Sequence, residues 1–172
     1  MRSLILFRHG KSDWDAAFKT DHERPLAHRG TEAARCMGRL LQKADEVPDL
    51  AITSSAVRAR DTVHLAAAAG HWACPIHIDP FLYETTPEEV ISWLRKLGAN
   101  PHSLLLTGHE PTWSELAGLL TGGIGLKVPT GTMLRIDLPI EDWSRVDRKI
   151  GQLRWLLPPK VVCQFEARTR GR

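Results

Sequence analysis

Leu4-Ile5-Leu6-Phe7-Arg8-His9-Gly10 opens the chain with a short apolar run that ends in two basic side chains and a glycine. The run is too short for a helix, so it predicts a buried strand. Open α/β sheets bind ligands at the carboxyl ends of their strands, where Arg8 and His9 stand. We expect Gly10 to let the backbone turn sharply, so that both side chains face one small volume.

This pair of side chains suits a phosphate group. Arg8 offers a planar set of donors that stays charged, and His9 can be a neutral nucleophile near pH 7. An Arg-His-Gly triplet also occurs by chance in about one chain in a hundred of this length, and residues at strand ends are often simply solvated. A phosphate site therefore needs partners from elsewhere in the chain.

The composition indicates one globular domain. The chain has 172 residues, of which 42% are hydrophobic and 25% charged, enough for one sizeable core and too few for two ordinary domains. We place a single domain at residues 1–160, followed at 161–172 by a short basic tail that lacks periodicity and is expected to be mobile. The formal net charge of +3 is modest and shows no basic stripe, which argues against nucleic-acid binding.

Cysteine usage and hydropathy favour the cytoplasm. Cys36, Cys74 and Cys163 are three in number and irregularly spaced, which favours reduced thiols over a disulfide framework. Arg8 interrupts the first apolar run before it could form the core of a signal peptide, and no later run is long enough to span a membrane. We expect a cytoplasmic protein without a membrane partner, as a monomer or a weak dimer.

Strand and helix patterns alternate along the chain. Further strands are expected at 50–53, 75–78, 103–107, 132–138 and 153–157, and a loop at 13–24. A helix is expected at 31–44, another after an N-cap at Ser54 or Ser55 as far as Ala69, and a third after the capping box at 86–89. A fourth begins at 111 and stops at the glycine pair 122–123.

Two of these strands also lead into basic side chains. Arg58 lies in the first turn of the helix after strand 50–53, where free N–H groups and the helix dipole favour an anion. His109 leaves strand 103–107 after a glycine. Either residue alone is more often a solvated side chain. Carboxyl ends of parallel strands gather at one sheet edge, however, so we expect both to face the pocket of Arg8 and His9.

Three other patterns carry less weight. Glu84 lies in the loop before the capped helix, where a carboxylic acid can reach into a cleft, although most such glutamates are solvated. His71, Cys74 and His77 match no common zinc spacing, and we expect no metal. The glycine-rich run 122–127 is no Walker loop, because its lysine lacks the preceding glycine and the following serine or threonine.

In order and spacing, these motifs resemble those of the histidine phosphatase superfamily, and above all its small SixA-type phosphohistidine phosphatases, over residues 1 to about 160. The resemblance implies a three-layer α/β sandwich of the phosphoglycerate mutase-like kind, with a mostly parallel central sheet and helices on both faces. The segments that carry it are Arg8-His9-Gly10, Lys11-Ser12-Asp13-Trp14, Arg24-Pro25-Leu26, 54–62, Leu82-Tyr83-Glu84, Gly108-His109-Glu110-Pro111 and Pro129-Thr130-Gly131.

The resemblance also implies roles for individual residues. His9 would be the nucleophile that becomes phosphorylated, while Arg8, Arg58 and His109 would bind the phosphoryl group, with a further hydrogen bond from Ser12. Phosphoryl transfer needs in-line placement and neutralisation of charge, which two arginines and a protonated histidine provide. Water would then hydrolyse the phosphohistidine without a metal or cofactor.

The general acid is less well defined. Glu84 stands where larger members of the superfamily carry their acid, and Glu110 replaces an asparagine of close relatives. A phosphorylated histidine has a leaving group that is stable without a strong proton donor, so this acid matters less than in ester hydrolysis. Glu84, Glu110 and neither residue stay open as alternatives.

The predicted function is a phosphatase that acts on phosphohistidine in a phosphotransfer protein. The alternative within the superfamily is a monoesterase for small sugar or nucleotide phosphates; a mutase is disfavoured, because Asp15 stands where mutases carry asparagine. The alternative outside enzymes is an inactive phosphate- or phosphoprotein-binding module. His9 argues against it, since binding alone needs only the arginines and a helix N-terminus.

Overall fold

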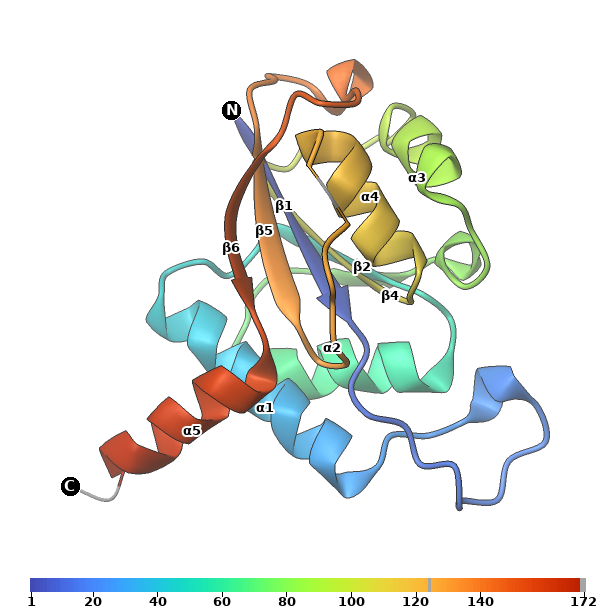
Figure 1. Cartoon of the computed structure of the whole chain (residues 1–172), viewed down its shortest axis with the longest axis vertical. Coiled ribbons are helices and arrows are strands. Elements are labelled where there is room, and N and C mark those ends of the chain that lie inside the picture. Colours follow the sequence, from blue (N-terminus) through green and yellow to red (C-terminus); the bar gives the residue numbers. More distant parts are fainter. Residues whose placement is uncertain (124, 171–172) are drawn as a thin grey trace.

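A computed structural model describes residues 1–123 and 125–170, with side chains up to residue 168 (Figure 1). The strands in these residues are β1 (Arg2–Arg8), β2 (Leu50–Thr53), β3 (Ile76–Ile78), β4 (Ser103–Gly108), β5 (Met133–Leu138) and β6 (Gln152–Leu157). They form one sheet in the order β3-β2-β4-β1-β5-β6. The first four strands pair in parallel, and β5 runs antiparallel to both of its neighbours.

β1 lies inside the sheet because its sequence is apolar on both faces. Leu4 and Leu6 belong to one hydrophobic core, and Ile5 and Phe7 to the other. All four side chains are buried. A strand covered on both faces reads as a continuous apolar run rather than an alternating one. The opening run of the sequence therefore becomes a strand that feeds both cores.

Helices cover both faces of the sheet, which confirms the predicted three-layer α/β sandwich. The helices in the described residues are α1 (His28–Lys43), α2 (Val57–Gly70), α3 (Pro87–Leu94), α4 (Thr112–Thr121) and α5 (Pro159–Arg170). In Figure 1, α1, α2 and α5 lie on one side of the strands and α3 and α4 on the other. Apolar side chains of α1 and α2 join the core of Ile5, and those of α3 and α4 the core of Leu4.

The prediction of an irregular tail is wrong for residues up to Arg170, which form α5. Glu166 on this helix accepts two hydrogen bonds of 2.7 Å from the guanidinium of Arg39 on α1. Val162 packs against the core on the same side of the sheet. These contacts are tertiary, so the local sequence gave no sign of them. Arg172, counted in the predicted tail, lies outside the described residues.

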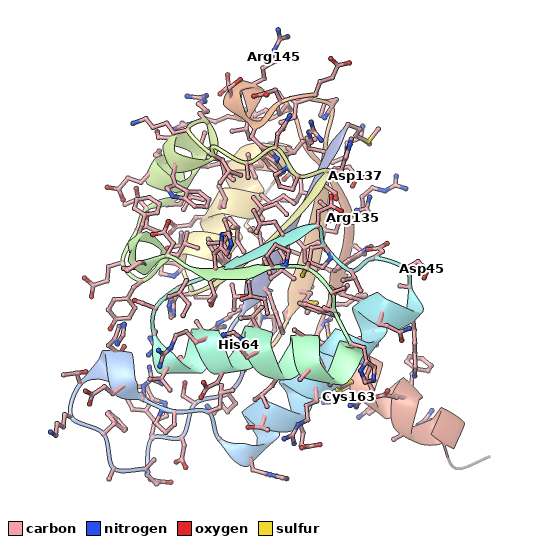
Figure 2. All side chains as sticks on the ribbon, turned by 180° about the vertical axis from the view of Figure 1, so that it is seen from behind. Asp45, His64, Arg135, Asp137, Arg145 and Cys163 are labelled. Carbon is pink, nitrogen blue, oxygen red and sulfur yellow. A yellow bond between two sulfur atoms is a disulfide. The ribbon has the colours of Figure 1, made fainter. Side chains whose placement is uncertain are left out.

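The expectation of three reduced thiols is also wrong. Cys36 on α1 and Cys163 on α5 form a disulfide that joins positions 127 residues apart, and Cys163 is labelled in Figure 2. Cys74 is the free cysteine and is half-buried. Spacing along the chain could not reveal the pair, because it depends on how α5 packs against α1. Within the described residues, no helix combines the length and the apolar character needed to cross a bilayer.

Candidate active site

Three strand ends bring the predicted basic residues together. Arg8 and His9 end β1, His109 follows β4, and Arg58 lies in the first turn of α2 after β2. These strands are neighbours in the sheet, with β4 between β2 and β1. The ring centroids of His9 and His109 are 5.2 Å apart. Nη2 of Arg58 lies 3.5 Å from Nδ1 of His109.

His9 is held as a neutral ring with one free nitrogen. Its Nδ1 donates to the carbonyl of Gly10 at 2.7 Å, because a carbonyl can only accept, and Nε2 therefore keeps its lone pair. Burial, opposed by this hydrogen bond and aided by the charges of Arg58, Arg8 and Arg24, lowers the pKa of His9 to about 4. At pH 7 the imidazole is uncharged and nucleophilic at Nε2.

Gly10 allows a close contact with the backbone of α1, rather than the predicted sharp turn. Its φ is not among the positive ones, and a Cβ at Gly10 would lie 2.8 Å from the carbonyl oxygen of Gly30 on α1. Its N–H donates to Oγ1 of Thr62 at 2.9 Å, and that hydroxyl donates to the carbonyl of Arg58 at 2.6 Å. The glycine thus permits a close approach of the loop to α1 and α2, which fixes the backbone next to His9.

His109 is oriented by Ser54. Because Arg58 donates to Nδ1, the ring proton sits on Nε2 and is donated to Oγ of Ser54 at 2.8 Å. Burial, with the charges of His9 and Arg58, lowers the pKa of His109 to about 3. His109 is therefore neutral in the protein without a bound anion, and its protonation beside a transferred phosphoryl group stays a prediction. The N-cap of α2 is Ala56 rather than the predicted Ser54 or Ser55, although the hydroxyl of Ser54 also accepts from the N–H of Ala56 at 3.3 Å.

Arg58 shows two edges that differ in their partners. At its outer edge, Nη1 donates to the carbonyl of Asp21 at 2.6 Å and Nη2 to Oδ2 of Asp21 at 2.9 Å. At its inner edge, Nη2 faces His109, and Nε is buried without a partner in the described residues. The inner edge therefore holds a donor that is available to a ligand.

The other predicted phosphate-binding residues also present buried donors without partners. Arg8 donates from Nη1 to the carbonyl of Val128 at 2.7 Å, while its Nε has no partner in the described structure. Oγ of Ser12 is equally unpartnered, and the residue is 5% exposed. An unsatisfied buried donor costs about 1–3 kcal/mol. Orphaned atoms occur elsewhere too, but here three belong to residues predicted to bind one anion.

Asp21, which sequence reasoning missed, connects several residues of the site. Its Oδ1 accepts from Nε and Nη2 of Arg24 at 3.1 and 2.8 Å, and its Oδ2 from the hydroxyl of Tyr83 at 3.1 Å. Burial alone would raise its pKa, but the hydrogen bond from Arg24 and the charges of Arg58 and Arg24 lower the pKa of Asp21 to about 2. Arg24-Pro25-Leu26 was the nearby signal that could have drawn attention to this turn.

In the described structure neither predicted acid hydrogen-bonds to His9 or His109, although the charge of Glu110 acts on Arg8, opposing the effect of burial that lowers the pKa of Arg8. Glu84 is exposed, and its charge adds to the effects of burial and of Asp21 that raise the pKa of Tyr83. Oε1 of Glu110 accepts from the N–H of Ser114 in the first turn of α4 at 3.1 Å. No group of three or more His, Cys, Asp or Glu residues in the described part of the chain is arranged to hold a metal ion.

The α/β sandwich and its paired histidines and arginines define a class of proteins that handle phosphoryl groups through histidine. The sequence profile of the histidine phosphatase superfamily (branch 1) matches residues 4–90. The chain belongs to this superfamily, whose members are phosphatases and mutases.

Some curated relatives of the chain carry no functional name, and others, which match over a smaller share of the chain (38–41%), are 2,3-bisphosphoglycerate-dependent phosphoglycerate mutases. An uncharacterized chloroplastic protein of Arabidopsis thaliana is 31% identical over 144 residues, which cover 78% of this chain and 66% of the relative. An uncharacterized protein of Mycobacterium tuberculosis is 38% identical over 114 residues, covering 66% of this chain and 68% of the relative. The match thus spans about two thirds of the length of these relatives.

Solved structures share the fold. The protein histidine phosphatase SixA complexed with tungstate has a TM-score of 0.78 at 23% identity, covering 95% of this chain and 99% of that one. The alpha-ribazole phosphatase of Shigella flexneri has a TM-score of 0.70 at 22% identity, with 91% and 96% covered. A mycobacterial glucosyl-3-phosphoglycerate phosphatase has a TM-score of 0.66 at 16% identity, with 89% and 97% covered.

Proposed function

We propose that the protein is a metal-independent phosphatase that forms a phosphohistidine on His9, and that its substrate is phosphohistidine in a phosphotransfer protein. The observation that carries the proposal is the set of unpartnered buried donors on Arg8, Ser12 and Arg58, together with a neutral His9 on which the charges of Arg58 and Arg8 act and whose Nδ1 is bonded to Gly10, which leaves Nε2 free. Preorganised donors of this kind stabilise the equatorial oxygens of a transferred phosphoryl group. The cytoplasmic location and the monomeric or weakly dimeric state stay predictions.

The reaction requires two displacements at phosphorus. Nε2 of His9 attacks, the bond from phosphorus to the substrate nitrogen breaks, and the leaving imidazole keeps that electron pair. The proton of His9 stays on Nδ1, which continues to donate to the carbonyl of Gly10, and this carbonyl stabilises the positive charge that the ring acquires. Water then attacks phosphorus, the P–Nε2 bond breaks, its electron pair returns to Nε2 of His9, and the proton of the water passes to solvent or phosphate.

The lack of a suitable acid in the described site favours a nitrogen leaving group over an alkoxide. Glu84 is exposed, Glu110 is engaged with the start of α4, and the low pKa of Asp21 keeps it ionised. An alkoxide needs a proton as it departs, whereas an imidazole already protonated on its other nitrogen leaves as a neutral ring. The fold shared with SixA, named a protein histidine phosphatase, adds support.

The second candidate is a monoesterase for small phosphates, which the shared fold of the alpha-ribazole and glucosyl-3-phosphoglycerate phosphatases favours. Incubation with a phosphorylated phosphotransfer domain, followed by measurement of acid-labile phosphate, separates the two when run beside a panel of sugar and nucleotide phosphates. We expect loss of phosphate from the domain with the parent protein and none with His9→Ala. Turnover of small esters alone would favour the monoesterase, and tight phosphate binding without any turnover would favour a binding module.

A further inference from the structure

We propose that Asp21 is a positioning residue that acts through Arg58, holding the outer edge of its guanidinium so that the inner edge faces the phosphoryl group beside His9 and His109. The proposal deepens the proposed function, since it concerns the same anion site. It assigns a role to a turn, η1 (Asp21–Glu23), that lies 37 residues from Arg58 in the sequence.

The guanidinium of Arg58 has an outer and an inner edge. Nη1 and Nη2 form its outer edge, and both donate to Asp21, one to the backbone carbonyl and one to Oδ2. Nε and the remaining hydrogen of Nη2 form its inner edge, which faces His109 and has no partner at Nε in the described residues. A guanidinium that is fixed at its outer edge presents its inner edge in one orientation. A phosphoryl group at that edge accepts a hydrogen bond from Nε, and a second, parallel one from Nη2 once His109 takes up a proton on Nδ1 and releases the hydrogen of Nη2; this is the arrangement in which arginine binds most strongly.

Fixing the side chain of Arg58 costs conformational entropy. Arginine has several rotatable bonds, and fixing them costs up to about 2 kcal/mol. Arg58 is 5% exposed and already fixed by two short hydrogen bonds. The protein has therefore met this cost during folding, and the anion encounters a preorganised donor.

The carboxylate of Asp21 has no acceptor position left for a further hydrogen bond. Oδ1 accepts two hydrogen bonds from Arg24, and Oδ2 accepts one each from Arg58 and Tyr83. A carboxylate has about four acceptor positions, so all of them are filled. Asp21 thus neither donates a proton nor binds the substrate directly, and its effect has to pass through the groups that it holds.

A competing interpretation predicts the opposite change in anion affinity when Asp21 is removed. If Asp21 were only an internal anion that occupies Arg58, its removal would free the outer edge for phosphate and strengthen anion binding. If it positions Arg58, its removal weakens binding, because the inner edge loses its fixed orientation. The direction of the change in affinity therefore decides between the two.

The experiment is a double-mutant cycle on tungstate binding, measured by titration calorimetry at pH 7.5 with Asp21→Asn, Arg58→Ala and the double variant. We expect Asp21→Asn to weaken binding roughly tenfold, the value of one charge-assisted hydrogen bond. Arg58→Ala weakens it further, and adding Asp21→Asn to Arg58→Ala changes affinity by less than about twofold. Glu23→Gln, on the same turn, is the matched control and leaves affinity unchanged.

Two outcomes overturn the proposal: tighter binding by Asp21→Asn, or equal loss from Asp21→Asn with and without Arg58. The second would mark a general structural effect, and thermal unfolding of each variant shows whether the fold itself is weakened. Because tungstate binding needs no turnover, the cycle is independent of the phosphatase assay. Failure of the parent protein to hydrolyse phosphohistidine, together with the expected cycle, would refute the proposed function and leave the role of Asp21 intact.

Discussion

His9 and His109 each have one ring nitrogen that donates to a fixed protein oxygen, and a second nitrogen that keeps its lone pair. The donating atoms are Nδ1 of His9, to Gly10, and Nε2 of His109, to Ser54. The same burial that lowers both pKa values keeps both rings neutral at pH 7. In the proposed mechanism, these two rings act as the nucleophile, His9, and as a ring that can accept a proton when an anion arrives, His109.

The low pKa values can be observed directly. We predict that in protein free of phosphate and sulfate both rings titrate well below pH 6, His9 at a pKa of about 4 and His109 at a pKa of about 3. Their ring nuclear magnetic resonances, assigned with His9→Gln and His109→Gln, give these values. Titration of either ring near pH 6.5, the ordinary value for histidine, would show that burial is not decisive here.

Anion binding should take up a proton at His109. A dianion next to the ring favours its charged form and raises the pKa of His109 above the value of about 3 in the free protein. Between the two pKa values, affinity then rises as pH falls. We predict that sulfate, which stays dianionic above about pH 3, binds more tightly as the pH is lowered from 8 toward the pKa of His109 in the free protein, and that His109→Gln removes this dependence. A flat profile in the parent protein would contradict the coupling.

Sequence reasoning found the residues whose signal is local. Arg8 ends β1, His9 and His109 follow β1 and β4 directly, and Arg58 lies in the first turn of the helix after β2, so their position at a sheet edge could be predicted. Asp21 could not, because it lies in an irregular stretch and its role depends on a guanidinium 37 residues away. That His109 is neutral in the free protein was not predicted, since the depth of burial that lowers its pKa is not visible in a sequence.

At the scale of elements, α1 and α2 touch through their backbones. A Cβ on Gly38 of α1 would lie 1.9 Å from the carbonyl oxygen of Ala66 on α2. α2 carries the alanine-rich face that allows this approach, and it also positions Arg58 and Thr62.

Gly38→Ala tests this contact. We predict a loss of roughly 1–3 kcal/mol in the free energy of unfolding, or more, because backbone atoms have to separate. Gly98→Ala is the control, since a Cβ there meets nothing within 4 Å. Urea denaturation of both variants measures the difference, and equal stability would mean that the helices do not pack so closely.

The disulfide is the second element-scale feature, since it anchors α5 to α1. We predict that Cys163→Ser lowers the free energy of unfolding by roughly 2–4 kcal/mol, as for other disulfides that close long loops. Dithiothreitol should lower the melting temperature of the parent protein and have no effect on Cys163→Ser. Cys74→Ser, which leaves the pair intact, is the control. A parent protein insensitive to reductant would contradict the cross-link.

Elements were predictable where their ends are encoded locally. The capping box of α3 was read from residues 86–89, and in the structure the Thr86 hydroxyl and the Glu89 carboxylate bond each other's N–H groups. α5 was missed, because its partners, Cys36 and Arg39, are more than 120 residues away. Helices held by tertiary contacts alone leave little trace in periodicity.

At the scale of the whole molecule, the sheet order produces the site. β4 lies between β2 and β1, so residues that follow three separate strands emerge side by side at one edge. The parallel arrangement of these strands could be predicted from the alternation of strands and helices. The antiparallel pairing of β5 with β1 could not, because pairing direction at that edge follows from the path of the long connection before β5.

The central claim is that Nε2 of His9 accepts the phosphoryl group, and trapping that intermediate tests it most directly. The protein is mixed briefly with a phosphorylated phosphotransfer domain, quenched in alkali, where phosphohistidine survives, and digested for mass spectrometry. We predict one added phosphoryl group on the peptide that contains His9, and none in His9→Ala or on the peptide of His109. Release of phosphate with no labelled His9 peptide, or hydrolysis that persists in His9→Ala, would contradict the account.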